Sequence, residues 1–387
     1  MGSRYHQLDS IRGIAALTVL LGHFASSILI FCTCTNTTGN EDHVILNLFK
    51  YTPLSFFGAG HEAVILFFLL SGFVLSLPFF KQTNTGYGQY LIRRICRIYI
   101  PFAIALLFAV VMYFISSPSV ITHMSSWFNG QWDMPIDVKD VLAALGFIGV
   151  FDTDKINPPI WSLVHEMRIS IIFPFLMFVL VRWRTLFSVA LACALSVLGI
   201  AATSVLNPSS LVNMYITIHY AAIFMVGALL AKHMSEISRF IRGKSRIVKV
   251  IMLLIGFLLY NFKTVLPNWS LIHNYLFNEW AITIGGSIYI SIAFGSITLE
   301  RVLLLSPIQF LGKISYSLYL YHMVVLLSLT HLLHGWMNIE IILVISFVVS
   351  LIVSTVMYYL VEKPSMNFGK YLTGKERSTK NQRTTAA

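Results

Sequence analysis

The chain has 387 residues, of which 57% are hydrophobic and only 11% are charged, whereas ordinary soluble domains are about 25% charged. A single water-soluble core could not bury so much apolar surface, so the composition excludes a soluble enzyme and indicates an integral membrane protein. The net charge of +11 fits either nucleic-acid binding or membrane topology, and the positions of the charges decide between them.

Ten apolar runs follow one another along the chain. A membrane-spanning helix requires about 20 mainly apolar residues, and most of these runs reach that length. We therefore predict an all-α, polytopic transmembrane bundle of about ten spans. The runs are Ile11–Phe31, Phe56–Phe80, Ile98–Ser116, Trp161–Val181, Leu186–Leu206, Leu211–Ala231, Val250–Phe262, Glu279–Thr298, Ile308–Leu333 and Ile339–Val361.

The basic residues predict how these spans are oriented. With the N-terminus in the cytoplasm and one crossing per run, 20 Lys and Arg fall in inner segments and four, Lys50, Lys139, Lys155 and Lys263, in outer ones. This asymmetry is the positive-inside pattern, and it places both termini in the cytoplasm. The basic charge then reflects topology and anionic inner-leaflet lipid, not nucleic acid. We expect a transmembrane domain over residues 1–362 and a basic, disordered tail over 363–387.

The first span carries two intramembrane polar residues, Arg12 and His23. Eleven residues correspond to three helical turns plus about 20°, so both side chains project from one face, about 16 Å apart along the axis. A cation near the cytoplasmic surface and a titratable base deeper on the same face would suit a ligand channel. Snorkelling of the arginine and a carbonyl partner for the histidine would explain the pair equally well.

The next elements add a carboxylate and an arginine cluster. His61 and Glu62 lie near the outer end of the second span, upstream of a Ser71-Gly72 pair where helices could approach closely. Arg93, Arg94 and Arg97 then form a compact cationic patch where the third span meets the membrane. Arginine binds phosphate oxygens bidentately, although positive-inside anchoring alone would also explain some of these residues.

Two short apolar segments do not fit a simple span. Val138–Val150 is too short to cross, and making it a span would place Arg182 and Arg184 outside, so we interpret it as re-entrant or interfacial. Val250–Phe262 is also short, and its helix is expected to begin within the preceding basic stretch.

Two later spans carry clustered polar residues. The fourth begins at Pro158-Pro159, which suits a helix start, and places Glu166 within its first turns toward the outer face. There Glu166 would orient a histidine or bind a substrate hydroxyl, or else form a structural interhelical pair. The ninth span has a hydroxyl-rich face that ends at His322. We interpret His322, and His219 in an earlier span, more readily as core histidines than as catalysts.

The four cysteines show no zinc-type spacing with histidines, so we expect no metal site. Cys32 and Cys34 are too close in sequence for an easy mutual disulfide, and all four are interpreted as structural.

Six short segments, in order, resemble the acyltransferase type 3 family, the bacterial membrane O-acyltransferases of surface glycans and related acceptors. Leu8–Ala16 resembles the family's opening motif, and Arg12 with His23 fits its basic residue followed, after a gap of ten residues, by a histidine. Phe67–Phe73 resembles its Phe-Phe-x-x-Ser-Gly-Phe segment, and Arg94 with Arg97 fits its Arg-x-x-Arg motif. Trp161–Leu163 with Glu166 resembles its Trp-Ser-Leu-x-x-Glu element, and Ser315–His322 resembles its Ser-Tyr-x-x-Tyr-Leu-x-His element.

The chain also departs from the family pattern. Where the family often has an acidic residue just before the Phe-Phe pair, this chain has Ile65, and Glu62 on nearly the same helical face is expected to substitute. Many relatives have a second acid after the tryptophan motif's glutamate, whereas this chain has Met167.

The resemblance implies a multi-pass protein of the bacterial cytoplasmic membrane that takes acyl-coenzyme A, commonly acetyl-CoA, as cytoplasmic donor. The acceptor would be a hydroxyl of an envelope carbohydrate, and no cofactor would be bound permanently. Arg12, Arg93, Arg94 and Arg97 would hold the donor phosphates. Glu62, Trp161, Ser162, Tyr316 and His322 would contact substrate.

His23 would take the acceptor's proton, since histidine titrates near neutral pH, and Glu166 would fix its tautomer or bind the acceptor. A covalent acyl-imidazole on His23 is the alternative mechanism. A glycan exporter or flippase without chemistry is the rival from another class, because it would use the same intramembrane charges for passage. The sequence leaves the acceptor, the acyl chain and the oligomeric state open.

Overall fold

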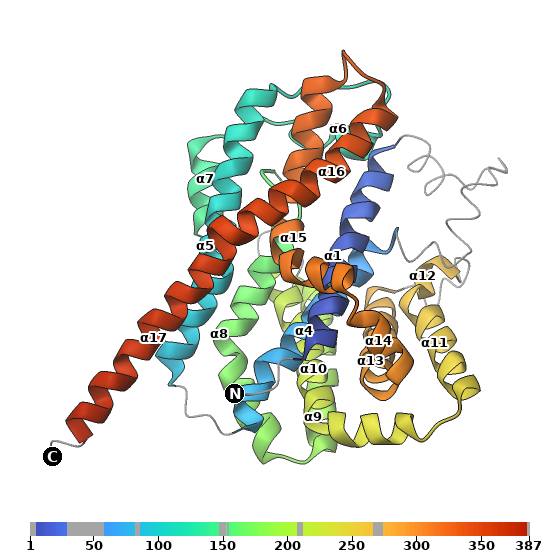
Figure 1. Ribbon diagram of the computed structural model, residues 1–387, viewed down its shortest axis with the longest axis vertical. Coiled ribbons are helices and arrows are strands. Elements are labelled where there is room, and N and C mark those ends of the chain that lie inside the picture. Colours follow the sequence, from blue (N-terminus) through green and yellow to red (C-terminus); the bar gives the residue numbers. More distant parts are fainter. Residues whose placement is uncertain are drawn as a thin grey trace. The chain divides into compact units, whose positions relative to one another are not determined.

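The computed structural model describes residues 5–28, 58–81, 86–146, 152, 155–206, 212–265 and 274–384, and its regular elements there are helices (Figure 1). In chain order they are α1 (His6–Ser27), α4 (Gly60–Phe80), α5 (Tyr87–Ser116), α6 (Ser126–Asn129), α7 (Val138–Leu145), α8 (Ile160–Arg182), α9 (Thr185–Leu206), α10 (Val212–Arg242), α11 (Arg246–Tyr260), α12 (Phe262–Val265), α13 (Tyr275–Gly295), α14 (Ile297–Leu303), α15 (Ser306–Leu333), α16 (Ile339–Met357), the π-helical turn η2 (Tyr358–Glu362) and α17 (Lys363–Thr384).

Eight helices of the described chain are long and apolar enough to cross a membrane: α1, α4, α5, α8, α9, α10, α15 and the continuous run from α16 into α17. α13 and α14 form a ninth candidate only if they count as one span, because they meet at a bend of 98°. The all-helical, multi-pass prediction is therefore confirmed, but the structure supports eight or nine spans by length and composition instead of ten.

The predicted seventh span accounts for part of this difference. α11 begins at Arg246, inside the basic stretch as expected, where the Ser245 side chain accepts a hydrogen bond from the Val248 amide. It has 15 residues. At 1.5 Å per residue it is about 22 Å long, shorter than the hydrocarbon core of about 30 Å.

The chain divides into two compact units. Unit 1 comprises residues 1–82, 123–127 and 175–315, and its tightest packing joins α4 to α10. A Cβ added at Gly72 would overlap the backbone of Phe224, and one added at Gly227 would overlap the backbone of Leu69. These glycines therefore let the two helices touch through their backbones, as expected for membrane helices with small residues at their contacts.

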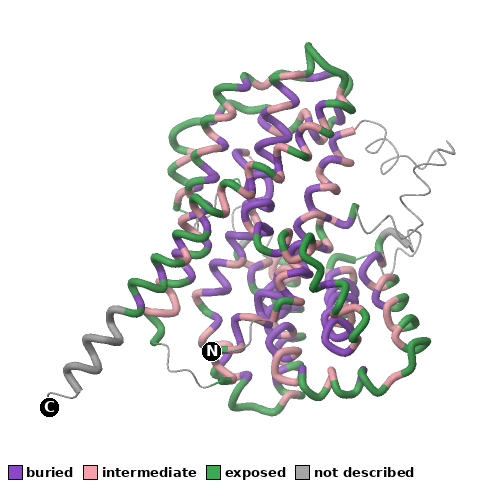
Figure 2. Tube along the Cα trace, in the orientation of Figure 1, coloured by how far each residue is buried: buried purple, intermediate pink, exposed green. Residues whose placement is uncertain are grey.

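Within unit 1 the helices differ in how far they are covered. Two-thirds (67%) of the most apolar window of α4 is buried, whereas only 22% of that of α9 is. The tube coloured by burial shows this contrast between inner and rim helices (Figure 2). α4 is thus a central element, whereas most of α9 is not covered by other helices.

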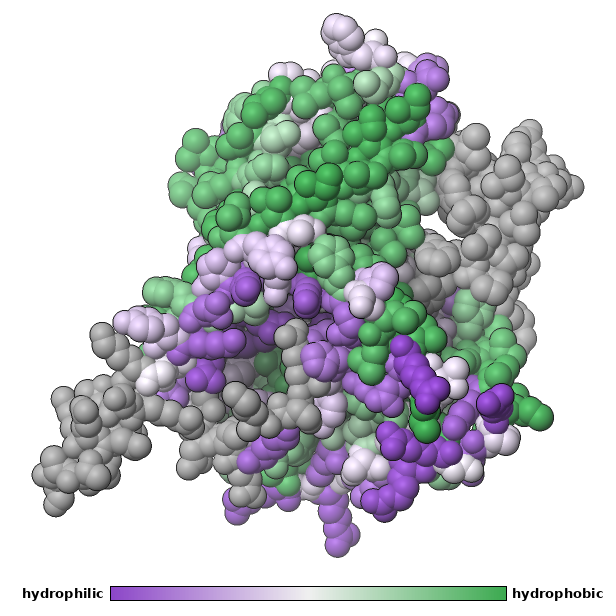
Figure 3. Space-filling model, viewed as in Figure 1, coloured by the Kyte–Doolittle hydropathy of each residue, from purple (hydrophilic) through white to green (hydrophobic). Residues whose placement is uncertain are grey.

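Unit 2 comprises residues 83–122, 128–174 and 316–387, and it includes α5, α7, α16 and α17. Its α5 carries exposed apolar residues such as Leu107 and Phe114, and α16 carries Val344 and Ile352. The space-filling view shows an apolar surface over these helices (Figure 3). This surface is the one expected to contact the hydrocarbon of the bilayer.

The start of the C-terminal tail differs from expectation. Where the sequence predicted a basic, disordered tail from Lys363, α17 continues to Thr384, and its first turns pack on α5. Arg93 Nε donates to Thr373 Oγ1 at 2.8 Å, and Gly369 lies against the Cys96 side chain. Packing on α5 stabilises a helix whose own sequence is polar.

The segment predicted to be re-entrant or interfacial contains α7, a helix of eight residues that is too short to span. Its first turn has a capping box between Asp137 and Asp140. Lys155 Nζ donates to Asp140 Oδ2 at 2.5 Å, and this bond lowers the pKa of Asp140 and raises that of Lys155. Both groups are therefore charged at neutral pH, and their ion pair joins the first turn of α7 to Lys155.

Candidate functional site

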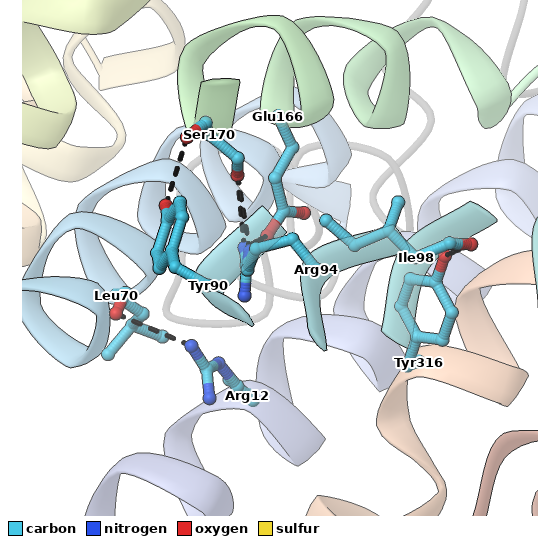
Figure 4. A network of polar contacts seen from close by, with 8 residues as sticks. All are labelled: Arg12, Leu70, Tyr90, Arg94, Ile98, Glu166, Ser170 and Tyr316. Carbon is cyan, nitrogen blue, oxygen red and sulfur yellow. Dashed lines mark hydrogen bonds and ion pairs between the residues drawn. The ribbon is translucent and has the colours of Figure 1, made fainter. Parts of the chain in front are cut away.

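The two residues singled out on the first span lie on one unbroken helix, α1, which places them on one face as predicted. Arg12 Nη2 donates to the Leu70 carbonyl of α4 at 3.4 Å, so the guanidinium is directed toward α4 within unit 1 (Figure 4). His23 is half-buried near the other end of α1. The structure thus keeps a cation and an imidazole on the same helix about 16 Å apart along its axis.

An aromatic partner covers one face of the His23 ring. The Trp127 ring stacks on it, with ring centroids 5.5 Å apart and planes 23° from parallel. Near-parallel stacking restricts rotation of the imidazole and presents its edge nitrogens, not its face, to other groups. Trp127 is a site residue that the sequence analysis missed.

Trp127 is held in place by the segment that precedes it. Ser125 donates its amide to the Ser27 carbonyl at 3.0 Å and its hydroxyl to the Ser26 carbonyl at 2.7 Å, and Met124 pairs with Ile28. These bonds fasten the segment to the last turn of α1, four residues beyond His23. No local pattern could reveal this contact, because Trp127 follows the third predicted span and His23 lies in the first.

The arginine patch divides into one buried and two exposed side chains. Arg94 is 9% exposed; its Nη2 donates to Glu166 Oε1 at 3.1 Å and to Ser170 Oγ at 3.2 Å. Tyr90 donates to the Ser170 carbonyl at 3.0 Å, and Figure 4 shows these side chains reaching from α5 to α8. Arg94 and Glu166, assigned separate roles from the sequence, are therefore partners in one ion pair whose arginine is buried and whose carboxylate is half-buried.

Arg93 and Arg97 differ from Arg94 in their environment. Both are exposed, and Arg93 Nε is engaged by Thr373. Arg97 is one helical turn beyond Arg93 on the same face of α5. These two guanidiniums are thus the members of the patch that are open to an anion from solution.

The remaining predicted contacts on α8 and α15 lie together in unit 2. Ser162 Oγ and the Tyr319 hydroxyl are 2.7 Å apart, and Tyr316 donates to the Ile98 carbonyl at 2.8 Å. Trp161 makes an edge contact with His165, with ring centroids 5.9 Å apart. His322 is fully buried and bonds the Leu318 carbonyl at 2.9 Å, which fits the core interpretation better than substrate contact.

A further carboxylate lies in the π-helical turn η2. Glu362 is 5% exposed and accepts a hydrogen bond from Ser317 Oγ at 2.7 Å. π-Helical turns occur often at functional sites. The sequence signal for Glu362 was a carboxylate at the end of an apolar run, because charged residues within membrane segments are costly and often functional. The predicted tenth span ends at Val361, one residue before this carboxylate.

The acidic residue expected to substitute in the second span lies in the first turn of α4. Glu62 is half-buried there, and the neighbouring His61 forms an ion pair with Glu279 of α13. Glu279 is 1% exposed. The N-terminal end of α4 thus carries a histidine–glutamate pair within unit 1 that the sequence did not reveal.

No group of three or more His, Cys, Asp or Glu side chains among the described residues could hold a metal ion. Cys96 is buried, Cys193 is exposed, and Cys32 and Cys34 lie outside the described residues.

Comparison with known proteins decides the family. A sequence model described as "Acyltransferase domain" matches residues 5–359, which is most of the chain. The chain belongs to the acyltransferase type 3 family. No curated protein and no solved structure matches it. Its apolar helices and its membership of this family together identify the acyltransferase type 3 protein as a multi-pass membrane acyltransferase.

Proposed function

We propose that the protein transfers an acyl group, commonly acetyl, from acyl-CoA to a hydroxyl of an envelope carbohydrate at the bacterial cytoplasmic membrane. The observation that carries the proposal is His23: a titratable imidazole within a membrane helix of an acyltransferase, stacked on Trp127 in one orientation. Histidine is the side chain best suited to accept a proton from an alcohol near neutral pH.

In the proposed reaction His23 removes the acceptor's hydroxyl proton as the oxygen attacks the thioester carbonyl. The bond from carbonyl carbon to sulfur then breaks, the ester forms, and the CoA thiolate takes the proton back from the imidazolium. The alternative splits this reaction in two: the imidazole attacks the thioester first, and the acyl-imidazole passes its acyl group to the hydroxyl.

The donor's phosphates are assigned to arginines. Arg12 lies on the same helix as His23, so a donor whose phosphates reach Arg12 would extend its pantetheine arm toward the imidazole, about 16 Å away. Arg93 and Arg97 are the exposed guanidiniums of the patch and suit phosphate oxygens. Arg94 and Glu166 serve this role indirectly, because their ion pair fixes α5 against α8.

Replacing His23 tests the proposal. His23→Gln keeps a polar side chain but cannot titrate near neutral pH, so transfer of labelled acetyl from acetyl-CoA to the carbohydrate of membranes should fall about 10²–10⁴-fold. His123→Ala, an exposed histidine on the segment that carries Trp127, is the matched control and should retain activity. A His23→Gln protein acylating at near wild-type rate would sink the catalytic assignment.

The two mechanisms differ in whether the protein itself becomes acylated. Purified protein incubated with labelled acetyl-CoA and no acceptor should stay unlabelled under direct transfer. Label that is trapped on the wild type and absent from His23→Gln would instead establish the acyl-imidazole.

A further inference from the structure

A groove opens on unit 1 where α10 and α11 both pack against α13. Its volume is about 500 Å³, and its lining includes Ile237, Phe240, Met252, Ile284, Ser287 and Ser291. From Ile284 to Ser291 it follows α13 for two turns, or about 10 Å. Beside it, Gly295 of α13 lies against the Ile241 side chain of α10, which lines the groove, and Ser238 donates to the Phe294 carbonyl at 2.8 Å.

Apart from Glu236, the groove is lined by apolar side chains and by two serines. Phe240 and Ile284 are 62% and 48% exposed, so the groove opens outward. Its two serines use their hydroxyl protons internally: Ser287 donates to the Thr283 carbonyl at 2.6 Å, and Ser291 donates to the Ser287 carbonyl at 2.7 Å. Few donors therefore remain along α13 for a sugar or a nucleotide, whereas a hydrocarbon chain needs none.

Cations gather where α10 passes into α11. Lys244 Nζ lies 4.1 Å from the centroid of the Phe240 ring, which lines the groove, and Lys249 on the first turn of α11 donates to the Arg242 carbonyl at 3.4 Å. Between residues 232 and 249 there are six Lys and Arg and one acid, Glu236, which lines the groove and pairs with His233 at 3.2 Å. In Figure 3 hydrophilic surface lies beside apolar surface at the lower right.

We propose that this groove binds one phospholipid with an anionic headgroup, with an acyl chain against Phe240, Met252 and Ile284 and the phosphate at Lys244 and Lys249. The volume lies within the range of about 300–1,000 Å³ usual for small-molecule sites. Apolar walls that lead to a cationic rim match the two halves of such a lipid, and each Lys or Arg near an anionic headgroup strengthens binding about fivefold. The site is independent of acyl transfer.

Lipid retention by the purified full-length protein tests the proposal. The protein is delipidated in detergent, incubated with phosphatidylglycerol, phosphatidylcholine or phosphatidylethanolamine of identical acyl chains, and analysed by native mass spectrometry. One phosphatidylglycerol should be retained at least about fivefold more strongly than phosphatidylcholine. Equal retention of the two, or strongest retention of phosphatidylethanolamine through Glu236, would overturn the anionic assignment.

Matched variants locate the bound lipid. Lys244→Gln and Lys249→Gln should each weaken phosphatidylglycerol retention about fivefold, whereas Lys363→Gln, which removes another lysine lying over an aromatic ring (Tyr359, 5.4 Å), should not. Ile284→Trp should fill the groove and abolish retention, while Ile352→Trp on the exposed face of α16 should leave it intact. Persistent retention by Ile284→Trp would place the lipid elsewhere and refute the site.

Discussion

Arg94 and Arg97 lie three residues apart on α5, yet one is buried in an ion pair and the other is exposed. An Arg-x-x-Arg motif therefore places its two arginines in different environments, which the sequence alone cannot separate. The spacing identified the arginines as a patch, but the partner of Arg94 is on α8, and only tertiary packing brings Glu166 to it.

This difference predicts opposite effects of two alanine variants. Arg97→Ala should weaken acyl-CoA binding about tenfold to a hundredfold, since a charge-assisted hydrogen bond contributes about 1.5–3 kcal/mol, and leave thermal stability unchanged. Arg94→Ala should instead lower the free energy of unfolding by about 3 kcal/mol, because it leaves Glu166 without its buried counterion. Calorimetric titration with acetyl-CoA and thermal unfolding in detergent measure the two quantities. An Arg94→Ala protein of wild-type stability that no longer binds the donor would reverse these roles.

Trp127 should act on the reaction through His23. Trp127→Phe retains an aromatic face and should keep most of the acyl-transfer rate, whereas Trp127→Ala removes the ring stacked on the imidazole and should lower kcat at least about tenfold while the KM for acetyl-CoA changes little. The contact can also be read without activity: a pH-dependent change in Trp127 fluorescence should disappear in both Trp127→Phe and His23→Gln. Equal kcat values for the alanine and phenylalanine variants would leave Trp127 without a positioning role.

Several motif residues turn out to act at the scale of helix packing. Gly72 belongs to the Phe-Phe-x-x-Ser-Gly-Phe segment and lies against the Phe224 backbone of α10, and Gly13 of the opening motif lies against Gly312 of α15. Close helix approach at Ser71-Gly72 was predicted from small residues in an apolar run. The partner helices were not predictable, because any of the nine other apolar runs could have supplied the opposite backbone.

A methyl group at one of these contacts should therefore separate helices. Gly72→Ala forces α4 away from the Phe224 carbonyl and should lower the free energy of unfolding by about 1–3 kcal/mol, as overpacking does in other cores. Gly335→Ala, where nothing lies within 4 Å of the new carbon, is the matched control. Thermal unfolding of both variants in one detergent gives the comparison. Equal melting temperatures would show that α4 and α10 tolerate the extra group and that Gly72 is not a packing constraint.

For the molecule as a whole, hydrophobicity specified the membrane class and the helices but not the number of crossings. Long runs such as Phe56–Phe80 and Ile339–Val361 became long helices, since an apolar stretch has few alternatives in a bilayer. Glu279–Thr298 instead broke at Ser296, whose side chain caps α14, and Val250–Phe262 gave a helix of only 15 residues. Breaks of this kind depend on local capping and on neighbouring helices, which a hydropathy pattern does not contain.

The charge asymmetry predicts on which side of the membrane individual segments lie, because it depends on the distribution of Lys and Arg and not on the number of spans. Lys and Arg are concentrated in the segments expected inside, so Ser245 at the start of α11 and Gly374 on α17 should both face the cytoplasm, and Gly335 after α15 should face outward. Single cysteines at these positions, in a variant lacking the four native cysteines, are treated in intact cells with a membrane-impermeant maleimide. Labelling is expected at Gly335→Cys alone, and at Ser245→Cys and Gly374→Cys only after the membrane is opened. If Ser245→Cys reacts in intact cells while Gly374→Cys does not, an odd number of crossings separates them, and the broken α13–α14 pair or the short α11 is where the predicted ten-span path fails.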